Sequence, residues 1–190
     1  MATVVFQPWA DTLFRLALIA FALAIPGVFI VPMVFVRTPY NLNRRFPLTQ
    51  PVQFDHRHHA KDDQIACLYC HPGAESTPYA GVPATDVCMG CHSQIWATSA
   101  MLAPVRQSYF SGQPLAWNRV NDLPDFVFFN HSIHVARGNV ACVECHGDVA
   151  AEPAVHRARL FTMGWCLDCH RSRTAAQPAL RITNCTTCHR

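Results

Sequence analysis

The chain has 190 residues, enough for one domain with or without a membrane segment. Hydrophobic residues make up 51% and charged residues only 14%, and the formal net charge of +3 is too small to indicate a nucleic-acid partner. The 14 prolines make long regular helices unlikely outside the N-terminus. Ten cysteines and eleven histidines are the unusual feature of this composition.

An apolar run lies near the N-terminus. From Leu16 to Val36, 21 residues carry no charged or polar side chain. As a helix this run is about 31 Å long, enough to cross a bilayer core. Pro26 and Pro32 are expected to kink it, and Trp9 and Tyr40 flank it as interfacial aromatics often do. The alternative is a cleaved signal peptide, but the run exceeds an ordinary signal-peptide core and no A-x-A site follows it. We therefore predict an uncleaved transmembrane anchor.

All ten cysteines fall in five C-x-x-C pairs, and a histidine follows every pair directly. C-x-x-C-H is the attachment signature of c-type haem, in which the two thiols bind the vinyl groups and the histidine is the proximal iron ligand. Zinc sites, disulfides and thioredoxin-like pairs are the alternatives, but none requires a histidine after each second cysteine. The predicted covalent sites are Cys67, Cys70, Cys88, Cys91, Cys142, Cys145, Cys166, Cys169, Cys185 and Cys188, with proximal ligands His71, His92, His146, His170 and His189.

Five haems would leave about thirty residues for each, too few to build an ordinary core around every one. The sequence therefore predicts a multihaem cytochrome c fold with little regular structure. Short helices would wrap around five stacked haems, and one N-terminal transmembrane helix would be added. The predicted organisation is an anchor at residues 1–37, a linker at 38–52 and a pentahaem domain at 53–190.

Two further segments share the pattern F-x-H-x-x-H. Each precedes a C-x-x-C-H motif by a short distance, so the chain contains an internal repeat. Histidines three residues apart lie on the same face of a helical turn and can each serve a neighbouring haem. We predict that the second histidine of each pair serves the haem nearer in sequence, and that His58, two residues after the first, faces away. The predicted distal ligands are His56, His59, His131 and His134.

The fifth iron then needs another distal ligand. Met163 precedes Cys166 by three residues in the apolar context LFTMGW, which favours it slightly. His156 is the alternative and would make all haems bis-histidine, but it lacks the pattern around the other four. Plain core packing remains an open interpretation of Met163. Residues 93–128 contain three prolines and none of the predicted ligands, and we expect a docking surface or a cover for the haems there.

The arginines near the apolar run and the haem motifs predict opposite membrane orientations of the chain. Arg37, Arg44 and Arg45 follow the run and only Arg15 precedes it closely, which by the positive-inside rule places the C-terminal side in the cytoplasm. Haem c is attached outside the cytoplasmic membrane, and long domains translocate largely regardless of charge. We therefore expect a single-pass protein of the cytoplasmic membrane with its haem domain in the periplasm, and Arg44 and Arg45 near headgroups or propionates.

The segments PATDVCMGCH, LPDFVFFNHSIH and TMGWCLDCHR, with one anchor and five motifs, resemble the pentahaem cytochrome subunit of bacterial alternative complex III. The resemblance covers roughly residues 40–190. It implies an electron-transfer subunit of a quinol-oxidising complex in a respiratory or photosynthetic chain. It also implies partners: an iron–sulfur subunit, polytopic quinol-binding subunits, a monohaem cytochrome, and a periplasmic cytochrome c or small copper protein as acceptor.

Two other functions compete with this relay. A free-standing, membrane-anchored quinol dehydrogenase would share the single anchor, but the tetrahaem type has four haems rather than five. A multihaem catalyst such as a nitrite reductase would need an open iron position, whereas this chain has enough ligands to close every iron and contains no C-x-x-C-K. We therefore expect no catalytic site in this chain, and the quinol site in partner subunits.

Overall fold

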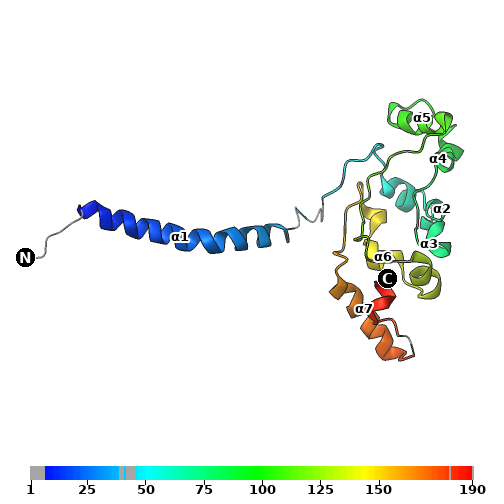
Figure 1. The fold of residues 1–190 in the computed structure, drawn as a ribbon. Coiled ribbons are helices and arrows are strands. Elements are labelled where there is room, and N and C mark those ends of the chain that lie inside the picture. Colours follow the sequence, from blue (N-terminus) through cyan, green and yellow to red (C-terminus); the bar gives the residue numbers. More distant parts are fainter. Residues whose placement is uncertain (1–6, 39–40, 42–45, 180, 190) are drawn as a thin grey trace, which may run out of the picture. The chain divides into compact units, whose positions relative to one another are not determined.

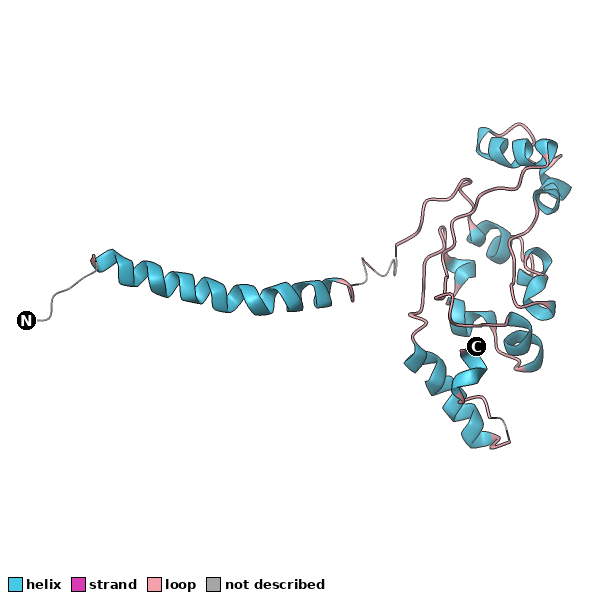
Figure 2. Ribbon diagram, viewed as in Figure 1, coloured by secondary structure: helices cyan, strands magenta, loops and turns pink. Residues whose placement is uncertain are grey.

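The computed structural model describes residues 7–38, 41, 46–179 and 181–189, so Tyr40, Arg44 and Arg45 lie outside the described residues. The chain divides into two compact units, Met1–Leu42 and Asn43–Arg190. Figures 1 and 2 show the first as a single long helix and the second as short helices joined by extended segments. No strand occurs among the described residues, which confirms the helical character predicted for this chain.

The first unit contains helix α1, Pro8–Phe35. Proline suits the start of a helix because the first N–H groups have no partner within it, and Asp11 forms an ion pair with Arg15 at 2.9 Å one turn later. The helix continues through Pro26 and Pro32 without ending. Trp9–Phe35 is long and apolar enough to cross a membrane, with a mean hydropathy of 2.5, and lies near the N-terminus, where a signal sequence would have the same properties.

The second unit is built from short helical segments, most of them one to three turns long. In chain order they are the π-helix η1 (Arg57–Asp62), α2 (Cys67–Cys70), α3 (Gly73–Ser76), α4 (Thr85–His92), the 3₁₀ turn η2 (Ala100–Leu102), α5 (Ala103–Ser111), the π-helix η3 (Ile133–Arg137), α6 (Cys142–His146), the 3₁₀ turn η4 (Val149–Ala151), α7 (Met163–Ala176) and α8 (Cys185–Cys188).

The apolar core that this unit builds from its own side chains is small. Val52, Met89 and Val105 form a buried cluster where α5 packs on α4, and Trp117 packs against its edge. No large side chain is completely buried among the described residues, and many large apolar ones are exposed, including Tyr79, Phe110 and Phe126. Part of the segment 93–128 thus has a structural role, because α5 covers the helix of the second C-x-x-C-H motif.

Candidate haem sites

Each C-x-x-C pair lies within one helical turn. Helices α2, α6 and α8 begin at the first cysteine of their motifs, while α4 and α7 begin three residues earlier. Residues three apart lie on the same face of a helix, so the two thiols of each motif face the same side. All ten cysteines are free thiols rather than disulfides. No group of three or more acidic, cysteine and histidine side chains lies close enough to hold a metal ion among the described residues.

Burial affects several of these thiols. It raises the pKa of Cys70, Cys88 and Cys166, and also of both cysteines of the third motif, Cys142 and Cys145. Attachment of a haem requires two free thiols on one side of the motif, and each of the five motifs offers them within one helical turn.

In four of the five motif histidines, Nδ1 forms a hydrogen bond with a backbone carbonyl. Because a carbonyl oxygen can only accept, Nδ1 carries the proton and donates it. The acceptors are Gly81 O for His71 (2.8 Å), Ile95 O for His92 (3.0 Å), Ile182 O for His170 (2.9 Å) and Phe126 O for His189 (3.1 Å). This bond fixes the tautomer and leaves Nε2 as the lone-pair nitrogen, which is the usual arrangement of an imidazole that binds a metal.

The fifth motif histidine, His146, contacts a side chain instead. Its Nδ1 lies 3.2 Å from Nδ2 of Asn121, while Oδ1 of Asn121 is buried without a hydrogen-bond partner among the described residues. Exchanging the two ends of the amide lets Oδ1 accept from His146 Nδ1–H. All five motif histidines then have the same tautomer, with the proton on Nδ1 and the lone pair on Nε2. No pattern in the sequence points to Asn121, which lies 25 residues before its partner.

The two F-x-H-x-x-H segments have nearly identical local geometry. Phe54 stacks on His59, and Phe129 stacks on His134, each with ring centroids 4.4 Å apart and an interplanar angle of 24°. The first histidine of each segment meets the same phenylalanine edge-on, at 4.7 and 4.8 Å. The sequence repeat is therefore also a structural repeat.

Both segments contain a π-helix rather than the ordinary helical turn assumed from the sequence. The N–H of Asp63 donates to His58 O, and the N–H of Gly138 donates to Ile133 O, five residues back in each case. The π-helix begins after the first histidine of each segment and includes the second one. A π turn contains more residues than an α turn, so it aims the side chains within it differently from an ordinary helical turn. The two imidazoles of a segment can thus face two different sites.

Hydrogen bonds orient three of these imidazoles, and the fourth is buried without one. His59 and His134 donate from Nδ1 to the carbonyl four residues earlier, at 3.0 and 2.7 Å, and His131 donates to Pro78 O at 2.9 Å. His56 Nδ1 is buried without a hydrogen-bond partner in the described part of the chain. Burial, with His71 and His59 nearby, lowers the pKa of His56 to about 4, and burial also lowers the pKa of His134 and His146.

Three of these four histidines face a motif histidine across a similar gap. The ring centroids are 6.1 Å apart for His59 and His92, 6.4 Å for His131 and His146, and 6.1 Å for His134 and His170. With a metal–imidazole bond of about 2 Å, two imidazoles on opposite sides of one iron have ring centres roughly 6 Å apart. His56 and His71 are close enough to interact electrostatically. The donor set and its spacing therefore fit haem iron.

Comparison with known proteins agrees with this geometry. Residues 127–190, which contain the second F-x-H-x-x-H segment and three C-x-x-C-H motifs, match the family described as cytochrome c7 and related cytochrome c. Over 165 residues the chain is 30% identical to the menaquinone reductase multiheme cytochrome c subunit of Nitratidesulfovibrio vulgaris, covering 74% of this chain and 77% of that protein. The chain is a multihaem cytochrome c. Covalently bound haem c is therefore its cofactor.

The ring contacts of the cytochrome favour another pairing than the one predicted within each segment. His59 lies opposite His92 rather than His71, and His134 lies opposite His170 rather than His146. The prediction assumed that the shorter sequence gap decides which motif an imidazole reaches. In the second segment, the first histidine, His131, is the one that lies opposite the nearer motif histidine, His146.

The structure also places the three remaining residues: His58, which was predicted to face away, and Met163 and His156, the two candidates for the fifth distal ligand. His58 is exposed, lies 3.7 Å from Asp63 and stacks near Trp96. Met163 starts α7 and is 67% exposed. His156 is half-buried, in coil rather than on an exposed strand, with Nδ1 3.1 Å from the Glu152 carboxylate.

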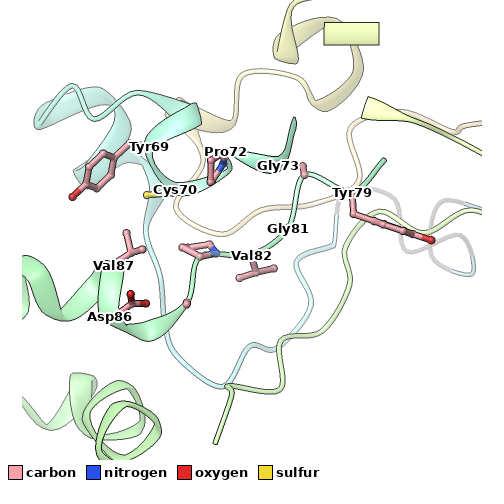
Figure 3. A pocket seen from close by; sticks show the side chains of 12 residues that line it. Tyr69, Cys70, Pro72, Gly73, Tyr79, Gly81, Val82, Asp86 and Val87 are labelled. Atoms are coloured by element: carbon pink, nitrogen blue, oxygen red, sulfur yellow. The ribbon is translucent and has the colours of Figure 1, made fainter. Parts of the chain in front are cut away.

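An apolar cleft of about 370 Å³ lies between the first and second motifs. Figure 3 shows Tyr69 and Cys70 on one side and Val82 and Val87 on the other. Gly73 allows the chain to close this loop, because a Cβ there would lie 2.5 Å from Tyr79 O. The same loop supplies Gly81 O to His71, so the close approach at Gly73 also positions a proximal imidazole.

Proposed function

We propose that this cytochrome relays electrons through five covalently attached haems c, one on each C-x-x-C-H motif. Each haem would supply an iron that alternates between ferrous and ferric states. The ten motif cysteines would form the thioethers, and the five motif histidines would be the proximal ligands. The shared Nδ1 hydrogen bonds of these histidines support this role, because they present Nε2 to a metal.

The opposed histidine pairs are the observation on which the proposed function rests. The ring centroids of His59, His131 and His134 each lie 6.1–6.4 Å from that of a motif histidine, a gap that one iron would fill. His56 is close enough to His71 for the two to interact electrostatically. An iron held by two imidazoles has no open position for a substrate, so these sites favour electron transfer over catalysis. We therefore propose His56, His59, His131 and His134 as distal ligands.

For the fifth iron we propose Met163 as distal ligand, with His156 as the alternative. His170 already faces His134, so Met163 would serve the fifth motif rather than the motif on its own helix. The Cys166 thiol, one turn along α7 from Met163, is close enough to Cys188 of the fifth motif for the two to interact electrostatically. His156 keeps Nε2 available because its Nδ1 contacts Glu152.

The identity of this fifth ligand can be tested by spectroscopy. A ferric iron bound to a thioether gives a weak absorbance band near the red edge of the spectrum. We expect this band in the native cytochrome and its loss in Met163→Leu, with Met101→Leu as the matched control. A band that persists in Met163→Leu, or that is missing from the native protein, would give the role to another residue, and His156→Leu would then be examined.

We also propose that the cytochrome is one subunit of a complex that exchanges electrons with the membrane quinone pool. The related protein is itself named as a subunit of a menaquinone reductase. The resemblance to alternative complex III suggests an iron–sulfur subunit, polytopic quinol-binding subunits and a monohaem cytochrome as neighbours. Helix α1 is long and apolar enough to cross a membrane. We propose that it anchors the chain in the cytoplasmic membrane, with the haem domain on the periplasmic side, where haem c is attached.

The direction of electron flow has two candidates. Alternative complex III oxidises quinol, so electrons would leave through a periplasmic cytochrome c or small copper protein. The name of the related subunit favours the opposite direction, toward menaquinone. Mixing the purified complex with a reduced and then an oxidised menaquinone analogue, and following haem reduction by absorbance, decides between them. Rapid haem reduction by the quinol supports the first direction, and rapid reoxidation by the quinone alone supports the second.

A second experiment tests the relay itself. Purification in mild detergent, followed by protein mass determination and the pyridine spectrum of denatured haem, should give five haems per chain and co-purifying larger subunits. Four or fewer haems on fully matured protein would contradict the pentahaem assignment. A chain that purifies alone and oxidises quinol would instead support a free-standing quinol dehydrogenase.

A further inference from the structure

The first and second C-x-x-C-H motifs are neighbours through the π-helix η1. His56 is close enough to His71 of the first motif to interact with it electrostatically, while the ring of His59 lies 6.1 Å from that of His92 of the second motif. A cleft lined by Cys70 and by Val87, the residue before Cys88, lies between the two motifs. One turn of chain thus serves two adjacent attachment sites.

The third and fourth motifs are neighbours in the same way through η3. His131 faces His146 of the third motif at 6.4 Å, and His134 faces His170 of the fourth at 6.1 Å. Arg173, on the helix of the fourth motif, donates to Gly138 O at the end of η3 at 2.7 Å. The repeated segment therefore joins a second adjacent pair.

The two pairs meet through the first and third motifs. The N–H of His131 donates to Pro78 O at 3.1 Å, and the N–H of Ser132 donates to Thr77 O at 3.2 Å, so the start of the second segment lies against the loop after α3. His131 also donates from Nδ1 to Pro78 O. The thiols of Cys67 and Cys142, the first residues of the two motifs, are close enough to interact electrostatically.

The fifth motif follows the fourth. His170 Nδ1 donates to Ile182 O, three residues before the fifth motif begins. Cys166 and Cys188 are close enough to interact electrostatically. The fifth motif is held from another side by Phe128, whose N–H donates to Cys188 O at 2.8 Å.

From these contacts we infer that the five attachment sites form a linear series in the order second, first, third, fourth, fifth. Figure 1 shows the corresponding helices α4, α2, α6 and α7 in this succession within the second unit. The series rests on the proposed function, because the motifs are taken as haem sites. It reverses the first two sites relative to the sequence, and makes the second and fifth motifs its two ends.

The order determines where partners must approach. Electrons enter and leave a linear series at its ends, so redox partners exchange electrons with the second and the fifth site. The second site is at the end where the linker joins the domain, since Val52 packs against Met89 of that motif, and Gln50 and Asn118 exchange two hydrogen bonds of 2.9 Å beside it. A partner that contacts residues 46–52 of the linker is thus expected at the second site.

Nearest-neighbour coupling of the haems tests this order. Charges further apart than about 10 Å are strongly screened, so oxidation of one haem shifts mainly the potentials of adjacent ones. The full holoprotein in detergent would be titrated potentiometrically, with each haem followed by NMR or EPR. Signals would be assigned with His56→Met, His59→Met, His131→Met and His134→Met, and His58→Met would serve as the control. We expect His59→Met to shift the potential of the first haem and leave the third unchanged.

Coupling between the first and third haems, without coupling between the second and third, supports the inferred order. Coupling of the second haem to the third, as a series in sequence order requires, would overturn it. If a variant fails to assemble, the iron positions located by anomalous scattering or cryo-electron microscopy of the unmodified protein answer the same question. A haem count below five would defeat the proposed function, whereas five haems coupled in sequence order would defeat the inferred series alone.

Discussion

The two F-x-H-x-x-H segments have the same internal geometry but different surroundings. Phe54 and Phe129 hold their stacked histidines at the same distance and angle. The first histidines differ: His131 donates from Nδ1 to Pro78 O, whereas His56 Nδ1 is buried without a partner among the described residues. The difference indicates that the segment fixes how its imidazoles are aimed, and that contacts from elsewhere fix where the segment itself lies.

Among the substitutions that probe the two segments, removal of the first histidine of each should have the largest effect on the haems. His56→Ala and His131→Ala should each convert one low-spin haem to the high-spin form, seen by EPR and by absorbance, because one axial ligand is lost. His131→Ala also loses the hydrogen bond to Pro78 O, worth about 1 kcal/mol, and should therefore unfold at a lower temperature than His56→Ala. His58→Ala is the control, and an unchanged low-spin spectrum in either variant would contradict the ligand assignment.

Gly73→Ala should disturb the loop after α3, which contacts both halves of the haem domain. An added Cβ would lie 2.5 Å from Tyr79 O and 2.9 Å from Ala80 O, both backbone atoms that cannot rotate away. The loop carries Pro78 O to His131 and Gly81 O to His71, so both segments should be affected. We expect a loss of about 1–3 kcal/mol in the free energy of unfolding, measured by thermal denaturation. Gly164→Ala, where a Cβ has only one distant neighbour, should be nearly neutral.

Replacing the stacking phenylalanines tests whether the two equal stacks also contribute equally to the free energy of unfolding. Phe54→Leu and Phe129→Leu should each cost about 0.5–1.5 kcal/mol beyond the lost apolar contact, because aromatic stacking on the histidine is removed. Denaturation of both variants should show similar losses. Phe110→Leu, at a ring that is 77% exposed, provides the control. Clearly unequal losses would mean that the surroundings, rather than the stack, hold one of the two histidines.

The smallest expected effect concerns Asn121, which has no counterpart in the first half. Its amide pairs with Nδ1 of His146, whereas a backbone carbonyl pairs with the other motif histidines. A hydrogen bond at Nδ1 makes the imidazole a stronger donor to the metal. Asn121→Leu should therefore raise the potential of the third haem, and Asn121→Asp should lower it, in a spectroscopic redox titration. Shifts of the same sign in both variants would contradict this role.

The sequence by itself determined the attachment chemistry of this cytochrome. A C-x-x-C-H motif needs only one helical turn to place its two thiols and its histidine, so its spacing predicts a haem site without knowledge of the fold. The F-x-H-x-x-H repeat was equally local, and its four histidines were recognised without knowledge of the fold. The apolar run that became α1 was visible for the same reason, because a single helix satisfies its own backbone hydrogen bonds.

Only the tertiary structure decided which imidazole faces which motif. The π-helical hydrogen bonds that aim His59 at His92 and His134 at His170 leave no clear mark in the sequence, since the same residues could form an ordinary turn. The meeting of Thr77 and Pro78 with the segment at His131, and the pairing of Asn121 with His146, join residues 25 to 55 positions apart. Such contacts depend on how the chain folds back on itself, and spacing along the sequence does not encode that path.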